Sequence, residues 1–474
     1  MSQQHRFRSL QLLVALISYS CLMGQTPKFQ PGDKFPGYKG IWFTLGQFYE
    51  YGDKYSGGLG TYTAKHVPLS IYAPAVDKTF FVYGGTTGMG DRYLLCMIGS
   101  FDHQTKQLSQ PTVVHDKLGV DDPHDDPSIL IDDDGYIWVF VSGRGRKRMG
   151  FKYRSKNPYN IEAFQLMSTE EMTYPQPWYI QDEGYFHFFT KYTGVRELYF
   201  ESSPDGIHWT EDRKLSSIKG EGMEKSGHYQ VSNHLGKKIG TFFNWHPNGN
   251  VDQRTNLYYL QSDDFGKSWT NAAGEALSIP LAELDVSARV VDHFSTNKKN
   301  VYLKDMQFDA NGHPVCLYIT SGGHKPGPEN RPREWRVSAW SGTTWRTSIV
   351  TTSDHNYDMG SIWIDGSKWT VVGPTQDGPQ VHGGGGEVVI WLSKDSGLTW
   401  AKKRTLTADS KRNHNYVRRV VDGKKPFQFF WADGNPDSLS ISNLYFGHLK
   451  GKIWQMPYEV PAGHAEPKRV KKTD

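Results

Sequence analysis

Short runs in which apolar and polar residues alternate recur along the chain, and each pair of runs is separated by a turn. A representative unit, HDDPSILIDDDGYIWVFV, begins at His124 and places two alternating runs around an Asp-Gly pair. Alternation with a period of two indicates half-buried β-strands, and Asp-Gly between two such runs indicates a hairpin. Similar units recur at intervals of about 50–75 residues. They begin at His66, His124, Thr173, His228, Lys304, His355 and His414.

Seven hairpin units in one chain are typical of a β-propeller, in which each unit forms one blade. The segments Ser262–Trp269 and Ser393–Trp400 both fit the pattern S-x-D-x-G-x-x-W. Such Asp-boxes form turns closed by Asp and Ser side chains, with a Trp that packs between blades. A strand near Ile41 is expected to complete the last blade and remove the exposed edges. We therefore predict an all-β, seven-bladed β-propeller with Asp-box motifs and little helix.

The two ends of the chain differ from the repeats. Residues 1–25 combine a basic start, a short apolar run and small residues, which predicts a signal peptide too short to span a membrane. Lipidation at Cys21 is an alternative. Residues 26–460 are expected to form one propeller domain, and residues 461–474 a basic disordered tail. The predicted signal peptide indicates a secreted or periplasmic protein.

The composition excludes several other classes of protein. The net charge is +4, from 54 basic and 50 acidic residues, and no basic stripe indicates nucleic-acid binding. Beyond the signal peptide only Cys96 and Cys316 remain, both in apolar runs, where buried free thiols are expected. A disulfide scaffold and a cysteine-based metal site are therefore excluded. We expect a monomer.

Candidate chemistry lies at the starts of the repeats. The first strand of each blade lines the central channel of a propeller, and five of the seven units begin with histidine. These histidines form either a shared site or a set of structural hydrogen bonds across the channel. Their spacing fits no known metal motif, so we expect no catalytic metal and no required cofactor. The acidic run Asp121–Asp126 leaves a structural calcium possible, and the basic loop containing Arg144 suits a carboxylate or sulfate.

Several segments resemble the BNR-4 repeat propellers, a group that includes ulvan lyases and related enzymes that cut between rhamnose and glucuronic acid. The resemblance rests on DDPHDDPSILIDDDGYIWVF, TYPQPWYIQDEGYFHFFTKYTG and SSPDGIHW. The opening GYKGIWF and KYSGGLGTYTAKHVPLSIYAP resembles a subgroup associated with rhamnoglucuronan lyase or rhamnosidase activity. The resemblance covers most of the chain after the signal peptide. It implies an acidic polysaccharide or oligosaccharide as the substrate.

The resemblance also implies roles for individual residues. His124 and Tyr174 match the first histidine and the tyrosine of the lyase site, and they are the candidate catalytic residues. Arg144 falls where those enzymes have a second histidine, and Lys191 falls where they have an arginine. Both replacements are cations, so they can bind a carboxylate, but an arginine stays protonated and cannot act as a base. His228 and His66 are further candidate substrate-binding residues.

Three functions fit these features. The first is β-elimination from a uronate, in which Tyr174 and His124 exchange protons with the substrate while Arg144 and Lys191 neutralise its carboxylate. The second is a glycoside hydrolase of the rhamnosidase type, centred on His66 or on a carboxylate pair from Asp125, Asp126, Asp305 and Asp358. The third is a propeller that binds glycans without cutting them. The lyase is the expected function.

Overall fold

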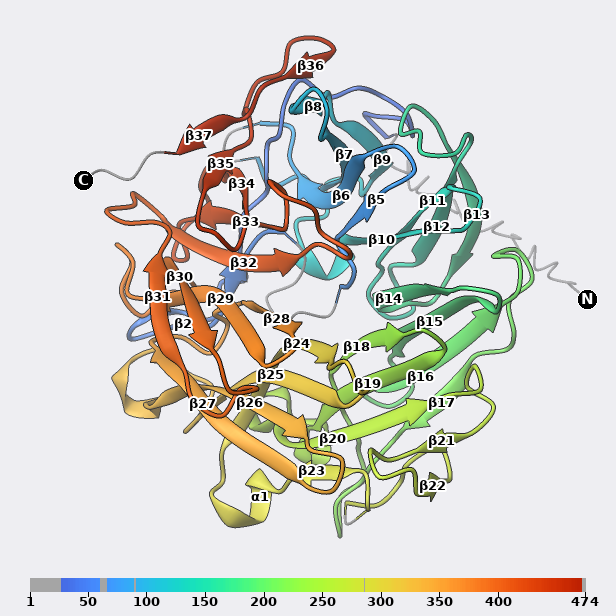
Figure 1. The fold of residues 1–474 in the computed structure, drawn as a ribbon, viewed down its shortest axis with the longest axis vertical. Coiled ribbons are helices and arrows are strands. Elements are labelled where there is room, and N and C mark those ends of the chain that lie inside the picture. Colours follow the sequence, from blue (N-terminus) through green and yellow to red (C-terminus); the bar gives the residue numbers. More distant parts are fainter. Residues whose placement is uncertain (1–26, 60–65, 89–90, 285, 471–474) are drawn as a thin grey trace, which may run out of the picture.

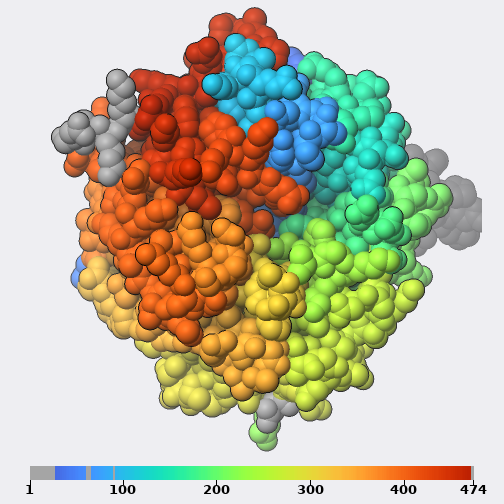
Figure 2. Space-filling model, in the orientation of Figure 1, coloured from blue at the N-terminus to red at the C-terminus, as the bar shows by residue number. Residues whose placement is uncertain are grey.

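The computed structural model describes residues 27–59, 66–88, 91–284 and 286–470. In these residues, seven sheets of four or more strands follow one another in chain order, together with two short two-stranded sheets. Figure 1 shows the seven sheets arranged as blades around a common centre, and Figure 2 shows the same order on the surface of the disc. The predicted seven-bladed β-propeller is confirmed.

Each blade is an antiparallel meander, because its hairpin turns join strands that are neighbours in sequence. The innermost strands are β5 (Ser70–Ala73), β10 (Pro127–Ile131), β14 (Thr173–Ile180), β18 (Gln230–Leu235), β24 (Asn300–Phe308), β28 (Ser361–Asp365) and β32 (Asn413–Arg419). The second strands are β6 (Lys78–Gly85), β11 (Ile137–Val141), β15 (Gly184–Lys191), β19 (Lys238–Trp245), β25 (Pro314–Ser321), β29 (Lys368–Gln376) and β33 (Phe429–Gly434).

The outer half of each blade is less regular. The third strands are β7 (Leu95–Asp102), β12 (Gly150–Ser155), β16 (Glu197–Ser203), β20 (Thr255–Ser262), β26 (Arg333–Trp340), β30 (Glu387–Ser393) and β34 (Leu444–Gly447). The outermost strands are β8 (Gln107–Ser109), β9 (Thr112–Asp116), β13 (Phe164–Glu170), β17 (Arg213–Ser216), β21 (Trp269–Thr270), β22 (Ala276–Leu277), β23 (Arg289–Val291), β27 (Trp345–Ser353), β31 (Ala401–Thr405), β35 (Ile453–Gln455) and β37 (Lys468–Val470).

The remaining elements are short. They are β1 (Phe43–Thr44), β2 (Phe48–Tyr49), β3 (Gly52–Asp53), β4 (Ser56–Gly57), β36 (His464–Ala465), α1 (His293–Thr296) and the 3₁₀ turns η1 (Pro123–Asp125), η2 (Pro247–Gly249), η3 (Val251–Gln253) and η4 (Pro328–Asn330). The four-residue α1 is the single α-helix of the described residues, as the repeat pattern predicts.

The Asp-boxes form the turns that their sequences predict. In the first, the Ser262 hydroxyl donates to Asp264 at 2.8 Å and accepts the Gly266 N–H at 2.8 Å. Gly266 has a φ of 82°, which is the left-handed region where a Cβ is disfavoured. The side chain of Trp269 is buried against Phe186, with ring centroids 6.4 Å apart. The turn therefore anchors the fourth blade to the third, and it contributes to the fold rather than to chemistry.

The ring closes differently from our expectation. The segment near Ile41 does not add a strand to the last blade. Instead, the Gly40 N–H donates to the Ser442 carbonyl of that blade, and the Ile41 N–H donates to the Gly84 carbonyl of the first blade. The segment thus lies between the first and last blades and hydrogen-bonds to both, because the backbone carbonyls at the edges of these blades need partners.

The C-terminal segment completes the closure. We expected residues 461–474 to be disordered, but β36 pairs with β8 of the first blade and β37 pairs with β35 of the last. This part of the expected tail is therefore ordered up to residue 470. The predicted signal peptide, residues 1–25, lies outside the described residues. Cys96 and Cys316 are buried free thiols, as predicted.

Candidate functional site

Tyr174 lies at the centre of an aromatic cluster where four inner strands, β5, β10, β14 and β18, begin. The Tyr174 ring centroid is 5.3 Å from that of His124, 5.7 Å from that of His66 and 5.7 Å from that of Tyr229. Its backbone has a φ of 58° at the irregular start of β14, and its N–H donates to the Ser142 hydroxyl at 3.1 Å. A left-handed tyrosine costs free energy, which is typical of residues held for a function.

His124 is oriented by the residue that caps its turn. The Asp122 carboxylate accepts the His124 backbone N–H at 3.1 Å and also the Nδ1–H of the ring. Because Nδ1 carries a proton in this pair, Nε2 is the ring nitrogen that can accept one. The side chain is buried, with 4% of the residue exposed. The arrangement suits a neutral imidazole that acts as a base.

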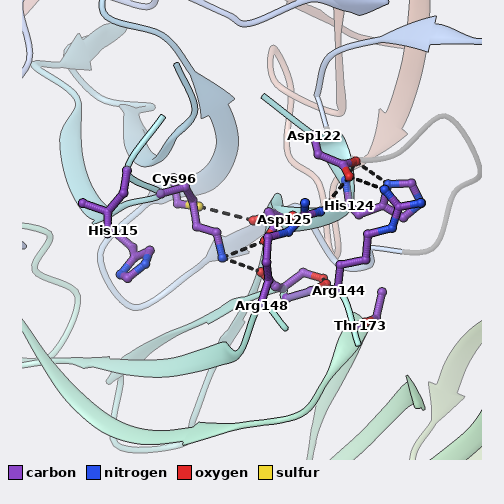
Figure 3. Close-up of polar contacts among 12 residues, drawn as sticks. Cys96, His115, Asp122, His124, Asp125, Arg144, Arg148 and Thr173 are labelled. Atoms are coloured by element: carbon purple, nitrogen blue, oxygen red, sulfur yellow. Dashed lines mark hydrogen bonds and ion pairs between the residues drawn. The ribbon is translucent and has the colours of Figure 1, made fainter. Parts of the chain in front are cut away.

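Cations surround the acidic run that precedes β10. Arg144 Nη1 lies 2.5 Å and Arg148 Nη2 lies 2.6 Å from the same Asp122 oxygen. Asp125 contacts Arg148 at 2.7 Å and Lys117 at 2.8 Å. Figure 3 shows Asp122 between His124 and these arginines. Carboxylates already neutralised by three cations are poorly suited to calcium, so this run does not fit the structural calcium that its composition left possible.

The burial of this cluster sets its protonation states. Burial alone would raise the pKa of Asp122, but His124, Arg144 and Arg148 outweigh it and hold the pKa well below its usual range. Burial lowers the pKa of His124, and Asp122 offsets this effect only in part. The site therefore contains an ionised carboxylate beside a neutral imidazole.

The phenol of Tyr174 has the opposite tendency. Burial raises its pKa well above the usual value, and the neighbouring phenols of Tyr229 and Tyr192 raise it further. Arg196 and Arg144 oppose this shift without reversing it. Tyr174 therefore keeps its proton at neutral pH and can donate it.

Arg144 and Lys191 have different surroundings. The Arg144 side chain is 45% exposed next to His124, so it is accessible to a ligand. Lys191 ends β15 with its Nζ 2.6 Å from Asp212, and its ammonium lies over the Tyr199 ring, outside the Tyr174 cluster. Arg196 lies nearer, with its guanidinium 5.6 Å from the Tyr229 ring centroid. We conclude that Arg196, rather than Lys191, occupies the cation position of the cluster.

The other two candidate histidines differ from His124. His66 is fully buried, and its Nε2–H donates to the His124 backbone carbonyl at 3.2 Å. His228 donates from Nδ1 to the Asn244 carbonyl at 2.9 Å and accepts the Ile218 N–H at Nε2. His66 therefore packs in the cluster, whereas the ring of His228 holds backbone together. The adjacent Tyr229 faces Tyr174 instead.

Sequence reasoning missed three members of the cluster. They are Tyr229, Arg196 and His246, whose ring centroid lies 4.6 Å from that of Tyr229. A signal for Tyr229 was present, because Tyr follows the first residue of the unit in both Thr173-Tyr174 and His228-Tyr229. No comparable pattern marks His246, which follows the second strand of its blade.

A second buried polar cluster lies between the second and third blades. Glu170, His187 and Glu201 place potential ligand atoms within 4.8 Å of one another. Lys152 lies among them, with its Nζ 2.6 Å from Glu170 and 2.8 Å from Glu201. An ammonium group at that position already balances the carboxylates, so this cluster does not fit a metal ion.

The fold and the Tyr174 cluster define a seven-bladed propeller with a polar site at the start of its inner strands. A family model described as a BNR repeat-containing family member matches residues 91–353, and the chain belongs to this family. Among the described residues, no helix is long and apolar enough to cross a membrane.

The relatives of the chain include ulvan lyases. It is 23% identical to an ulvan lyase of Nonlabens ulvanivorans over 76% of this chain and 80% of that protein. It is also 23% identical to an ulvan lyase, PL25, of a Pseudoalteromonas strain, over 52% of this chain and 58% of that protein. A solved PL25 ulvan lyase superimposes with a TM-score of 0.69 at 19% identity, covering 82% of this chain and 94% of that one.

Proposed function

We propose that the protein is a polysaccharide lyase that cleaves a rhamnose- and uronate-containing polysaccharide by β-elimination outside the cytoplasm. The observation that carries this proposal is the pair formed by a neutral, Asp122-oriented His124 and a protonated Tyr174, with ring centroids 5.3 Å apart. Ulvan lyases are among the relatives, which supports a substrate of this class.

The proton transfers follow from the protonation states of the two residues. His124 Nε2 removes the proton from C5 of the uronate, and the electron pair of that bond forms a C4–C5 double bond as the C4–O4 bond breaks. The Tyr174 hydroxyl donates its proton to the leaving O4. His124 then holds the proton taken from C5 while Tyr174 is a phenolate, and transfer of that proton from His124 to Tyr174 restores the starting state. The proposed proton transfers require no metal ion.

Arginine side chains supply the electrostatic stabilisation. Removal of the C5 proton is slow because negative charge develops on the carboxylate as an enolate-like system forms. Arg144 and Arg196 flank the Tyr174–His124 pair, and both favour a nearby negative charge, as their influence on the pKa of Tyr174 indicates. A guanidinium can bind a carboxylate through two parallel hydrogen bonds. These residues therefore hold the uronate with its C5 towards the acid–base pair.

The test is an incubation with ulvan and with other uronate polysaccharides, followed by ultraviolet absorbance and by reducing ends together. A lyase yields an absorbing unsaturated product in step with new reducing ends. New reducing ends without absorbance indicate hydrolysis, for which His66 was the sequence candidate. Binding without either signal indicates a glycan-binding propeller, and both outcomes would refute the proposal.

A further inference from the structure

We propose that a cleft beside this site binds a second anionic sugar of the same polysaccharide chain. The inference rests on the proposed function, and it concerns how the substrate is held rather than how it is cut. The cleft has a volume of about 600 Å³, within the range of small-ligand sites. Its lining includes Pro247, Asp252, Phe294, Lys298, Lys299 and His324.

A chain of packed aromatic rings joins the wall of the cleft to the proposed active site. The Tyr174 ring contacts Tyr229, and the Tyr229 ring contacts His246 at a centroid distance of 4.6 Å. His246 is followed directly by Pro247, which lines the cleft. The lining loops come from the fourth and fifth blades, next to the starts of their inner strands. The cleft therefore lies on the same side of the propeller as Tyr174, between the two blades that follow.

The charge of the cleft favours an anion. Within the described part of the chain, neither Lys298 nor Lys299 forms an ion pair, and Lys298 is exposed. The single carboxylate in the lining belongs to Asp252, and the ammonium of Lys54 forms an ion pair with it. His324 Nε2 lies 3.7 Å from the same carboxylate. Two positive charges are thus left to attract a carboxylate or a sulfate.

An exposed aromatic ring gives the cleft a surface on which a sugar can stack. Phe294 is 42% exposed and lines the cleft. Its ring packs edge-on against the fully buried Trp245 at a centroid distance of 5.1 Å. Its N–H donates to Asn256 at 2.8 Å, which fixes the backbone. The ring is therefore held in place before a ligand arrives, which lowers the entropy cost of binding.

An aromatic face beside two unpaired ammonium groups matches a pyranose ring that carries an acidic group. The pyranose ring packs on the side chain of Phe294, and the carboxylate or sulfate of the sugar lies against Lys298 and Lys299. Both chemistries occur in the disaccharide named for a bound structure of a related PL25 lyase, which contains glucuronate and a 3-sulfated rhamnose. The ligand class of the cleft is accordingly an acidic sugar, either a uronate or a sulfate ester.

The test measures ulvan binding in the Tyr174→Phe background, so that the polymer is not consumed. Replacing Lys298 and Lys299 together by alanine should raise the Kd about tenfold and flatten its dependence on salt, because two charge contacts are lost. The matched control replaces Lys267 and Lys394, exposed lysines in the Asp-box turns, and should leave the Kd unchanged. Equal Kd values for the two double variants would overturn the proposal.

A second pair of variants tests the aromatic surface. Phe294→Ala should weaken binding several-fold, whereas Phe294→Trp should restore it, because a ring is kept. Unchanged binding by Phe294→Ala, or an equal loss in both variants, would overturn this part of the proposal. Desulfated ulvan and carboxyl-reduced ulvan then identify the acidic group, since only one of them should lose its sensitivity to the lysine replacements.

Failure of the cleft proposal can be distinguished from failure of the lyase proposal. If lysine-dependent binding is found but wild-type protein forms no unsaturated product, the cleft is retained and the lyase proposal fails. If unsaturated product forms at the same kcat/KM on polymer with and without the two lysines, the lyase proposal is retained and the cleft fails.

Discussion

The second and seventh blades place a buried histidine at the same point of the repeat, yet the two residues serve different purposes. His414 accepts a hydrogen bond from the Trp431 indole at 3.0 Å and donates to the Ser410 hydroxyl at 3.0 Å, so both ring nitrogens are used in holding the blade. His124 is just as buried, but its ring is held through Nδ1 by Asp122 and lies against Tyr174. Burial and repeat position therefore do not distinguish a structural from a chemical histidine, whereas the side chains that the ring contacts do.

The largest effect should separate these two histidines. His124→Ala should lower kcat/KM on uronate polysaccharide by about 10²–10⁴-fold with little change in stability, because it removes a proton-transfer group. His414→Ala should leave the kcat of folded protein near wild type and destabilise the fold by about 1–3 kcal/mol, because the Trp431 N–H loses its acceptor. Initial rates and urea unfolding of both variants provide the comparison. A His414→Ala protein that is stable but inactive would contradict it.

An intermediate effect should separate two cations of the third blade. Arg196→Ala should lower kcat/KM by about 10–100-fold, the size expected for one charge-assisted hydrogen bond. Lys191→Ala should change kcat/KM by less than about threefold, because a half-buried ion pair such as that with Asp212, outside the cluster, contributes little to the reaction. Arg196→Lys, which keeps the charge, should recover part of the loss. The reverse ranking would restore Lys191 as the carboxylate-binding residue.

The smallest effect concerns the pH dependence of stability at His228. Burial lowers the pKa of His228 to about 4, whereas an unfolded histidine titrates near 6.5. Between these values the unfolded chain binds more protons, so the stability falls as the pH is lowered, by on the order of 1 kcal/mol per pH unit. His228→Gln keeps a donor and an acceptor without titrating, and its stability should fall less steeply between pH 6.5 and 4. Equal slopes in chemical unfolding would argue against this role.

Much of the fold could be predicted from sequence because its signals are local. The alternation of apolar residues marks the strands, and Asp-Gly or Asn-Gly pairs mark four of the seven hairpins. Ser262–Trp269 specifies its turn through contacts within eight residues. The closure could not be predicted in this way. Gly40 hydrogen-bonds to the last blade, and the 461–470 segment pairs with the first, so both contacts join residues far apart in the sequence. The blade edges that provide these partners come together only once the ring has formed.

The site was predicted only in part for a similar reason. His124 and Tyr174 stand at neighbouring repeat positions whose rings meet, so counting along the units predicts that they lie together. Lys191 lies on β15 with its ammonium directed to Asp212, while the following turn through Gly194 brings Arg196 to the cluster. At His228 it is the next residue, Tyr229, whose ring meets Tyr174, since adjacent positions along an extended chain face opposite sides.

The central claim is that the Tyr174–His124 pair carries out an elimination. It is tested most directly by following the ultraviolet absorbance of the unsaturated product from ulvan with the Tyr174→Phe and His66→Ala proteins at matched concentrations. We predict that Tyr174→Phe forms product about 10²–10⁴-fold more slowly than wild type while binding ulvan nearly as tightly, because only the donated proton is lost. His66→Ala should retain measurable product formation, because its imidazole positions the His124 carbonyl. A fully active Tyr174→Phe protein together with an inactive His66→Ala protein would contradict the account and make His66 the centre of the chemistry.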